Sequence, residues 1–301
     1  MNKKLLERLN SGEILICDGS TGIALQAIGC EPGVSMEKCG LENSDKLMAL
    51  HAEYIEAGAD IILTNTIGGS GLKLKKYGLE SETEFINKSL AELAKAVASR
   101  YPKTVYVAGN VGPTAELMEP YGNISESEIT KVFSQQIKAL LDGGVDFIFI
   151  ETMIDVNEAV SAVKAAKALC DLPIFASMSF DPGKNGFRTV MGNTPEKAVD
   201  MLQSVGADVV GSNCGSVFAS MMPDLIKQMK SAGAKLIAVE PNAGIPQMIN
   251  GKTFFPQTPQ EMAEHVPAMI DAGANIVGGC CGAMAEHIRL IAKTAREYVT
   301  R

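Results

Sequence analysis

Short apolar runs recur along the whole chain, and a segment with the apolar spacing of a helix follows each of them. The eight runs are Ile14–Cys17, Ile61–Leu63, Val105–Ala108, Phe147–Ile150, Ile174–Ala176, Val209–Val210, Leu236–Val239 and Ile276–Val277. Because they are continuous and do not alternate with polar residues, they are typical of parallel strands buried on both faces. The sequence therefore predicts eight consecutive strand–helix units.

The helices between these runs carry start and stop signals. Start signals of the capping-box type occur at Ser81–Glu84, Ser125–Glu128 and Thr258–Glu261, with a further start at Thr194-Pro195. A glycine suited to end a helix precedes the next apolar run at Gly58, Gly144, Gly206, Gly233 and Gly273. The units thus follow one another without a linker.

This pattern predicts one α/β domain over residues 1–301, a single TIM (β/α)8 barrel. A doubly wound open sheet shows the same alternation of strands and helices. The number of units and the chain length favour the closed barrel, which commonly takes about 250 residues.

A cysteine doublet, Cys280-Cys281, follows the last apolar run within a frame of glycines. Adjacent residues of a regular strand point to opposite faces, so the strand must end or kink for both thiols to serve one site. The flanking Gly278, Gly279 and Gly282 permit this.

A third thiol, Cys214, follows the sixth run. In a barrel, the sixth and eighth strands flank the seventh, which brings the three thiols within reach of one metal ion. Three thiolates bind Zn²⁺ and leave its fourth position open, as in catalytic sites. The alternative is that they are buried small apolar residues, as free cysteines often are.

The other cysteines, Cys17, Cys30, Cys39 and Cys170, show no partner spacing. The N-terminus lacks the long apolar stretch of a signal peptide, and no run approaches a membrane span. We therefore expect a cytoplasmic protein whose thiols stay free. The net charge of −8 and the absence of a basic cluster argue against nucleic acid or an anionic membrane as partner.

Polar residues follow the strands, where barrel enzymes carry their active sites. Asp18 follows the first run and Glu151 the fourth. The two carboxylates could hold an ammonium group, and the backbone amides of Gly19, Ser20 and Thr21 a carboxylate, which together suit an amino acid. A zinc ion with three thiolate ligands favours a soft fourth ligand, such as a substrate thiol that it deprotonates.

Seven segments resemble motifs of the homocysteine S-methyltransferase family, most closely the homocysteine-binding barrel of cobalamin-dependent methionine synthase. They are Asp18–Gly22, Thr64–Thr66, Gly109–Thr114, Ile150–Thr152, Gly211–Gly215, Glu240–Gly244 and Gly278–Gly282. The resemblance implies zinc held by Cys214, Cys280 and Cys281. It further implies that Asp18 and Glu151 bind the amino group of homocysteine, and that Asn242 approaches zinc when substrate is absent.

The resemblance implies methionine formation, with the methyl donor left open. The chain ends just after its eighth helix and lacks the Asp-x-His-x-x-Gly motif of corrinoid proteins. We expect a methyl-corrinoid such as methylcobalamin, carried by a separate protein. S-methylmethionine or betaine is the alternative, but this chain has no Trp and 5% aromatic residues with which to surround an onium cation.

Two other classes of function compete with methyl transfer. Glu151 and Glu240 could be the acid and nucleophile of a retaining glycosidase, although sugar binding usually uses aromatic residues. A barrel with structural zinc or redox-sensing thiols would need no substrate. A fourth Cys or His ligand would support that reading, but His51, His265 and His287 fall within predicted helices and not at strand ends.

Overall fold

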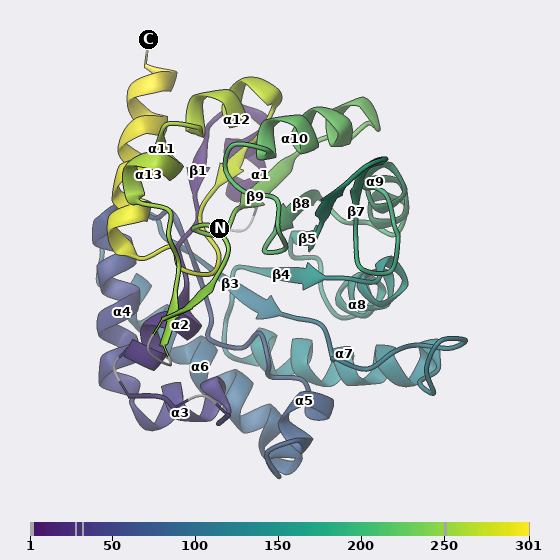
Figure 1. The fold of residues 1–301 in the computed structure, drawn as a ribbon. Helices are drawn as coiled ribbons and strands as arrows, with labels where there is room; N and C mark the ends of the chain where they lie inside the picture. The colour runs from purple at the N-terminus through teal and green to yellow at the C-terminus, as the bar shows by residue number, and fades with distance from the viewer. Residues whose placement is uncertain (1–2, 28, 32, 250–251, 301) are drawn as a thin grey trace.

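The computed structural model describes residues 3–27, 29–31, 33–249 and 252–300. Within these residues, one sheet of eight parallel strands has the order β1-β12-β9-β8-β5-β4-β3-β2 (Figure 1). The strands are β1 (Leu15–Ile16), β2 (Ile61–Leu63), β3 (Tyr106–Val111), β4 (Phe147–Met153), β5 (Ile174–Met178), β8 (Val209–Asn213), β9 (Ile237–Glu240) and β12 (Ile276–Val277). A parallel bridge between Cys17 and Ile61 joins the two ends of this order. The predicted TIM barrel is confirmed, and each of these strands overlaps one of the predicted runs, although β3, β4, β5 and β8 extend beyond them.

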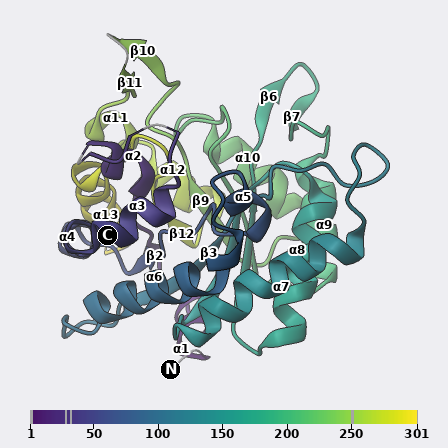
Figure 2. The same ribbon diagram turned by 90° about the horizontal axis from the view of Figure 1, so that it is seen from below.

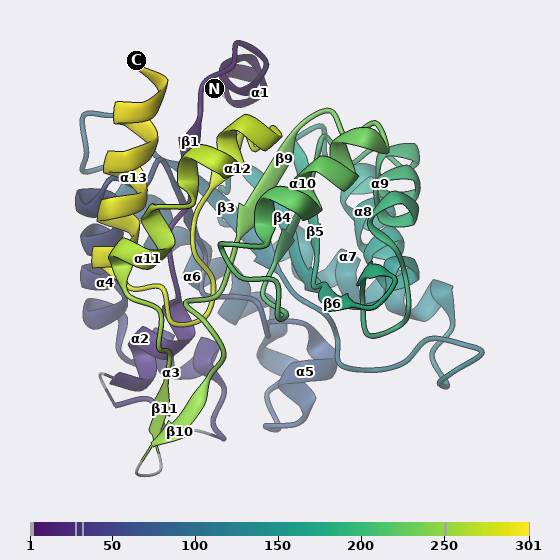
Figure 3. The same cartoon turned by 45° about the horizontal axis from the view of Figure 1, so that its top comes forward.

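Helices surround the barrel (Figure 1). They are α2 (Thr21–Ala27), α3 (Met36–Glu42), α4 (Ser44–Ala57), α5 (Gly71–Lys75), α6 (Thr83–Ala98), α7 (Glu126–Asp142), α8 (Val156–Leu169), α9 (Pro195–Ser204), α10 (Met222–Ser231), α11 (Pro259–Ala263), α12 (Val266–Ala272) and α13 (Ala285–Val299). The first helix, α1 (Lys3–Asn10), lies across one end of the barrel (Figure 3). Two hairpins, β6 (Asp181–Gly183) with β7 (Gly186–Arg188) and β10 (Gln247–Ile249) with β11 (Lys252–Phe254), project from the opposite end (Figure 2).

Most predicted helix boundaries are confirmed. Capping boxes start α7 at Ser125 and α11 at Thr258. The five glycines predicted to end helices all have positive φ, from +82° at Gly144 to +115° at Gly58. The capping box predicted at Ser81 is wrong, because Ser81 lies in a 3-10 turn (Glu80–Glu82) and α6 begins only at Thr83.

The core has two layers that alternate along each strand. Phe147, Phe149 and Phe175 fill the interior of the barrel, where the rings of Phe147 and Phe175 lie 4.3 Å apart. Intervening residues such as Ile148 and Ile150 pack outward against the helices. Leu5 and Leu9 of α1 belong to the interior layer and close the end of the barrel at which α1 lies. A site is therefore expected at the opposite end, from which the hairpins project.

The expectation that all thiols are free is wrong. Cys30 and Cys39 form a disulfide. The chain turns back after α2, so that α3 brings the Cα of Cys39 to 5.9 Å from that of Cys30, within the range of a disulfide. Five cysteines, Cys17, Cys170, Cys214, Cys280 and Cys281, are free. Among the described residues, no helix is long and apolar enough to cross a membrane; the cytoplasmic location stays a prediction.

Candidate active site

The inward-facing residues change from apolar to polar toward the open end of the barrel. On β4, Phe147 and Phe149 face the interior, and Glu151 follows at the same two-residue step. The same step along their own strands leads to Asn110 on β3, Ser177 on β5, Asn213 on β8 and Glu240 on β9. All of these polar side chains are buried. They form a polar layer directly above the apolar interior.

The structure brings together the three cysteines that the sequence singled out. The Sγ atoms of Cys214, Cys280 and Cys281 all lie within 4.8 Å of one another. The Cys214 and Cys281 sulfurs are 3.6 Å apart. These residues follow β8 and β12, with β9 between the two strands in the sheet. The three thiols therefore converge across β9 on one point at the mouth of the barrel.

Unusual backbone conformations aim the cysteines at that point. The backbone of Cys214 has a φ of +58°, in the left-handed region that residues other than glycine rarely adopt. β12 ends at Val277, before the doublet, and Gly282 beyond it has a φ of +82°. At Gly278, a Cβ atom would lie 2.7 Å from the Cβ of Cys17. The glycine frame thus permits both a close approach to β1 and the turn that carries two adjacent thiols to one side.

Asn242 links the two cysteine-bearing loops. Its Nδ2 donates to the carbonyl oxygen of Gly215 at 2.9 Å, and its Oδ1 accepts from the backbone amide of Cys281 at 3.0 Å. Both polar atoms therefore hold backbone on either side of the thiols. The role of Asn242 as a zinc ligand in the absence of substrate stays a prediction.

The three thiols fit a zinc ion. Sulfurs bound tetrahedrally to one zinc at about 2.3 Å lie roughly 3.8 Å apart, close to the 3.6 Å between the sulfurs of Cys214 and Cys281. Among the described residues, no fourth His, Cys, Asp or Glu joins this group. The donor set would therefore leave one coordination position for a ligand from outside the chain.

Protonation of the thiols reflects their proximity. Hydrogen bonds from Cys214 and Cys280 lower the pKa of Cys281 to about 4. Hydrogen bonding to the other two thiols and burial raise the pKa of Cys280 well above its usual value. Without a cation, the trio therefore favours a single thiolate. A bound divalent cation favours the deprotonated form of all three.

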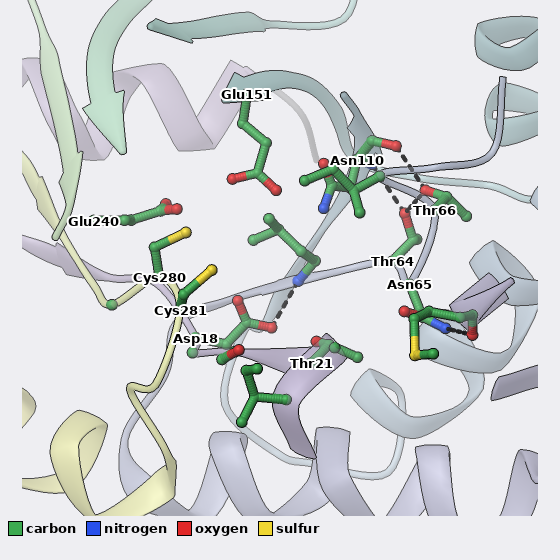
Figure 4. Close-up of a pocket in the computed structure, with 18 of the residues that line it drawn as sticks. Asp18, Thr21, Thr64, Asn65, Thr66, Asn110, Glu151, Glu240, Cys280 and Cys281 are labelled. Atoms are coloured by element: carbon green, nitrogen blue, oxygen red, sulfur yellow. Dashed lines mark hydrogen bonds between the residues drawn. The ribbon is translucent and has the colours of Figure 1, made fainter. Parts of the chain in front are cut away.

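Asp18 and Glu151 line the same cavity as Cys280 and Cys281, about 220 Å³ in volume (Figure 4). Asp18 Oδ2 accepts from the amide of Leu63 at 2.9 Å. Both carboxyl groups are buried. Burial raises the pKa of Glu151 to about 7, and that of Asp18 well above its usual range. The cavity thus holds sulfur ligands and acidic acceptors side by side.

Gly19, Ser20 and Thr21 line the cavity next to Asp18. The amide of Ser20 donates to the carbonyl oxygen of Ala283 at 2.9 Å, so it is occupied by the protein itself. Of the three amides predicted to bind a carboxylate, those of Gly19 and Thr21 have no backbone partner among the described residues and stay candidates for that role.

Sequence reasoning gave no role in methyl transfer to two residues of the polar layer. Glu240 lines the cavity, and its Oε1 atom is buried without a hydrogen-bond partner among the described residues. Burial and the charge of Glu151 raise the pKa of Glu240 well above its usual value. Asn213 is fully buried and donates to Glu151 Oε2 at 2.8 Å. The two-residue step along β8 and β9 is the signal that could have found both.

Solved structures share this fold. The crystal structure of the homocysteine methyltransferase MmuM from Escherichia coli in its metallated form matches with a TM-score of 0.80 and 22% identity, over 95% of this chain and 98% of that one. The oxidized form of the same protein matches with a TM-score of 0.79 and 24% identity, over 97% of this chain and 99% of that one. The carboxyl transferase domain of Rhizobium etli pyruvate carboxylase with pyruvate matches with a TM-score of 0.55 and 13% identity, over 99% of this chain and 49% of that one. At these identities, the likeness establishes the fold alone.

The family of the chain follows from a comparison of its sequence with models of protein families. The family model of homocysteine S-methyltransferases matches residues 15–295, which span the barrel from β1 into α13. The matched range includes the three cysteines and both predicted ammonium-binding carboxylates. The chain therefore belongs to the homocysteine S-methyltransferase family.

Proposed function

We propose that this protein transfers a methyl group to the thiol of homocysteine, giving methionine, on a zinc ion held by Cys214, Cys280 and Cys281. The observation that carries the proposal is a cluster of three sulfurs within 4.8 Å of one another, two of which, those of Cys280 and Cys281, line the same cavity as Asp18 and Glu151. A ligand with a thiol at one end and an ammonium group at the other suits such a cavity. Homocysteine has both.

Different residues of the cavity would bind the ammonium group, the carboxylate and the thiol of homocysteine. Asp18 and Glu151 would accept hydrogen bonds from the substrate ammonium, which favours their charged forms despite burial. Gly19 and Thr21 line the same cavity, and their amides would bind the substrate carboxylate. Zinc, when bound, would lower the pKa of the substrate thiol so that it is a thiolate at neutral pH. Binding at both ends fixes the sulfur in one orientation toward the mouth, as in-line methyl transfer requires.

Membership of the family and the lining of the cavity favour methyl transfer over the two competing classes of function. A glycosidase that uses Glu151 and Glu240 would not need three thiols, and no aromatic residue for sugar stacking is among the described residues that line the cavity. A purely structural zinc would use a fourth protein ligand of its own, and within the described part of the chain the cluster holds three.

For the donor, we propose a methyl-corrinoid on a separate protein. The described residues that line the cavity include no aromatic side chain able to face an onium cation. Two aromatic residues of the loops do not line it either: Tyr121 is 74% exposed, and Phe187 is half-buried on β7. S-methylmethionine and betaine are the competing donors.

Metal analysis and product assay test this function together. The zinc-loaded protein is incubated with homocysteine and, in separate reactions, methylcobalamin, S-methylmethionine or betaine, and methionine is measured. We expect methionine from methylcobalamin, and loss of both zinc and product in a Cys280→Ser, Cys281→Ser variant. Cys170→Ser, a change at a free thiol remote from the cavity, is the matched control.

Each part of the proposal has its own contrary result. Methionine formation by the double variant at the wild-type rate would exclude the zinc-based function. Much faster turnover with S-methylmethionine or betaine than with methylcobalamin would exclude the corrinoid donor while leaving homocysteine methylation in place.

A further inference from the structure

We infer that Asn213 is a positioning residue that holds Glu151 in the orientation needed to bind the substrate ammonium, an inference that rests on the proposed function. Asn213 lies on β8 immediately before the first metal-ligand candidate, Cys214. Its side chain is completely buried. It contacts Glu151, Thr152, Ser177 and Cys280, and so reaches β4, β5 and the loop after β12.

The amide group of Asn213 is oriented from its acceptor side. Its Oδ1 atom accepts from the hydroxyl of Ser177 at 2.6 Å and from the backbone amide of Thr152 at 2.8 Å. An oxygen with two donors is a saturated acceptor, so the side-chain amide cannot flip without losing both hydrogen bonds. The NH₂ group is thereby fixed toward Glu151.

The donor side of Asn213 then holds the carboxylate. Nδ2 donates to Glu151 Oε2 at 2.8 Å and to Thr152 Oγ1 at 2.7 Å. It also lies 3.6 Å from the sulfur of Cys280. Two N–H protons serve these three acceptors, so the sulfur contact is the weakest and Glu151 is one of the two main acceptors. A neutral donor on Oε2 orients the Glu151 carboxylate without cancelling its charge, so the group can still bind the substrate ammonium, and Asn110 hydrogen-bonds the same carboxyl group.

The backbone next to Glu151 has an unusual conformation that the hydrogen bonds of Asn213 stabilise. Thr152 has a φ of +59°, a left-handed conformation that is strained for a β-branched residue. The register between β4 and β5 also shifts between Ile150 and Met153. Asn213 bonds both the amide and the hydroxyl of Thr152. It therefore stabilises the bend that turns the Glu151 carboxylate toward the cavity.

The test compares two ligands that differ only in the amino group. Homocysteine and 4-mercaptobutanoate share a thiol and a carboxylate, and their dissociation constants are measured by calorimetry with the zinc-loaded full chain. The variants are Asn213→Asp, which keeps both accepted hydrogen bonds but removes the donors, and Asn213→Ala. Asn275→Ala is the control, because Asn275 Oδ1 accepts from the amide of Ile237 at the opposite end of the barrel.

We expect Asn213→Asp and Asn213→Ala to weaken homocysteine binding roughly ten- to a hundredfold, the usual effect of a hydrogen bond to a charged group. Binding of 4-mercaptobutanoate should change far less, and Asn275→Ala should leave the preference for homocysteine intact. In a Glu151→Gln background, Asn213→Ala should have little further effect, because the two residues act as one unit.

Ser177→Ala provides a milder second variant if the Asn213 variants do not fold, since it removes only the hydroxyl that orients Oδ1. It should reduce the preference for homocysteine in the same direction. Equal weakening of both ligands, additive effects with Glu151→Gln, or an unchanged preference in Ser177→Ala would each overturn the role of Asn213. A wild-type protein that binds neither ligand would overturn the proposed function together with this inference.

Discussion

His51 makes the stability of this protein depend on pH in a way that can be calculated. It lies on α4 with no exposed surface, and neither ring nitrogen has a hydrogen-bond partner among the described residues. Burial lowers its pKa from the model-compound value of 6.5 to about 4. The folded protein therefore holds His51 neutral, whereas the unfolded chain binds a proton there below pH 6.5. Stability is lost as the pH falls through this window.

The change that reveals this effect is His51→Leu, which removes the titrating group. As the pH falls from 7.5 to 4.5, His51 binds a proton in the unfolded state but stays largely unprotonated in the folded state. At 1.36 kcal/mol per pH unit, this costs the wild type about 2.5 kcal/mol relative to the variant. The free energy of unfolding of both metal-free proteins is measured by urea denaturation at the two pH values.

The buried carboxyls titrate in the opposite direction, because the raised pKa values of Asp18 and Glu240 favour the folded state at low pH. Both proteins contain these groups, so their contribution cancels in the difference. If the wild type and His51→Leu lost the same stability between the two pH values, His51 would not be buried as a neutral ring and the reasoning would fail.

Three further results are expected. Cys280→Ser, Cys281→Ser should abolish tight zinc binding and leave the circular dichroism of the barrel unchanged, because these thiols lie beyond the end of β12 and outside the apolar core; full zinc stoichiometry would contradict this. Thiol titration in denaturant without reductant should find five reactive cysteines, and seven after reduction of Cys30–Cys39; seven without reduction would contradict the disulfide. Asp18→Asn should weaken homocysteine about ten- to a hundredfold, measured by calorimetry, with little effect on 4-mercaptobutanoate.

The sequence predicted the barrel because its signals are local and repeated. Buried parallel strands give continuous apolar runs, and glycines with positive φ end the helices between them. It also indicated the cysteine cluster, since strand order in a barrel fixes which loops are neighbours. The disulfide was missed because a spacing of nine residues between Cys30 and Cys39 carries no signal until the turn after α2 is known.

The role of Asn213 was hidden for a different reason. Its partners are 36 to 67 residues away along the chain. Periodicity shows that Asn213 faces inward, but not which atoms it meets there. The contact lies where the β4–β5 register shifts and Thr152 has a positive φ, and periodicity reveals neither feature.

The charges of the cavity explain why it should select a dication and an ammonium group together. Asp18, Glu151 and Glu240 are buried in one cavity with two of the thiols, and no lysine or arginine is among the described residues that line it. Burial therefore raises the pKa values of all three carboxyl groups. Ionised together, these groups would repel one another at low dielectric unless cations arrive. Zinc at the thiols and an ammonium group at the carboxylates each relieve part of that repulsion, so binding at one end of the cavity should favour binding at the other.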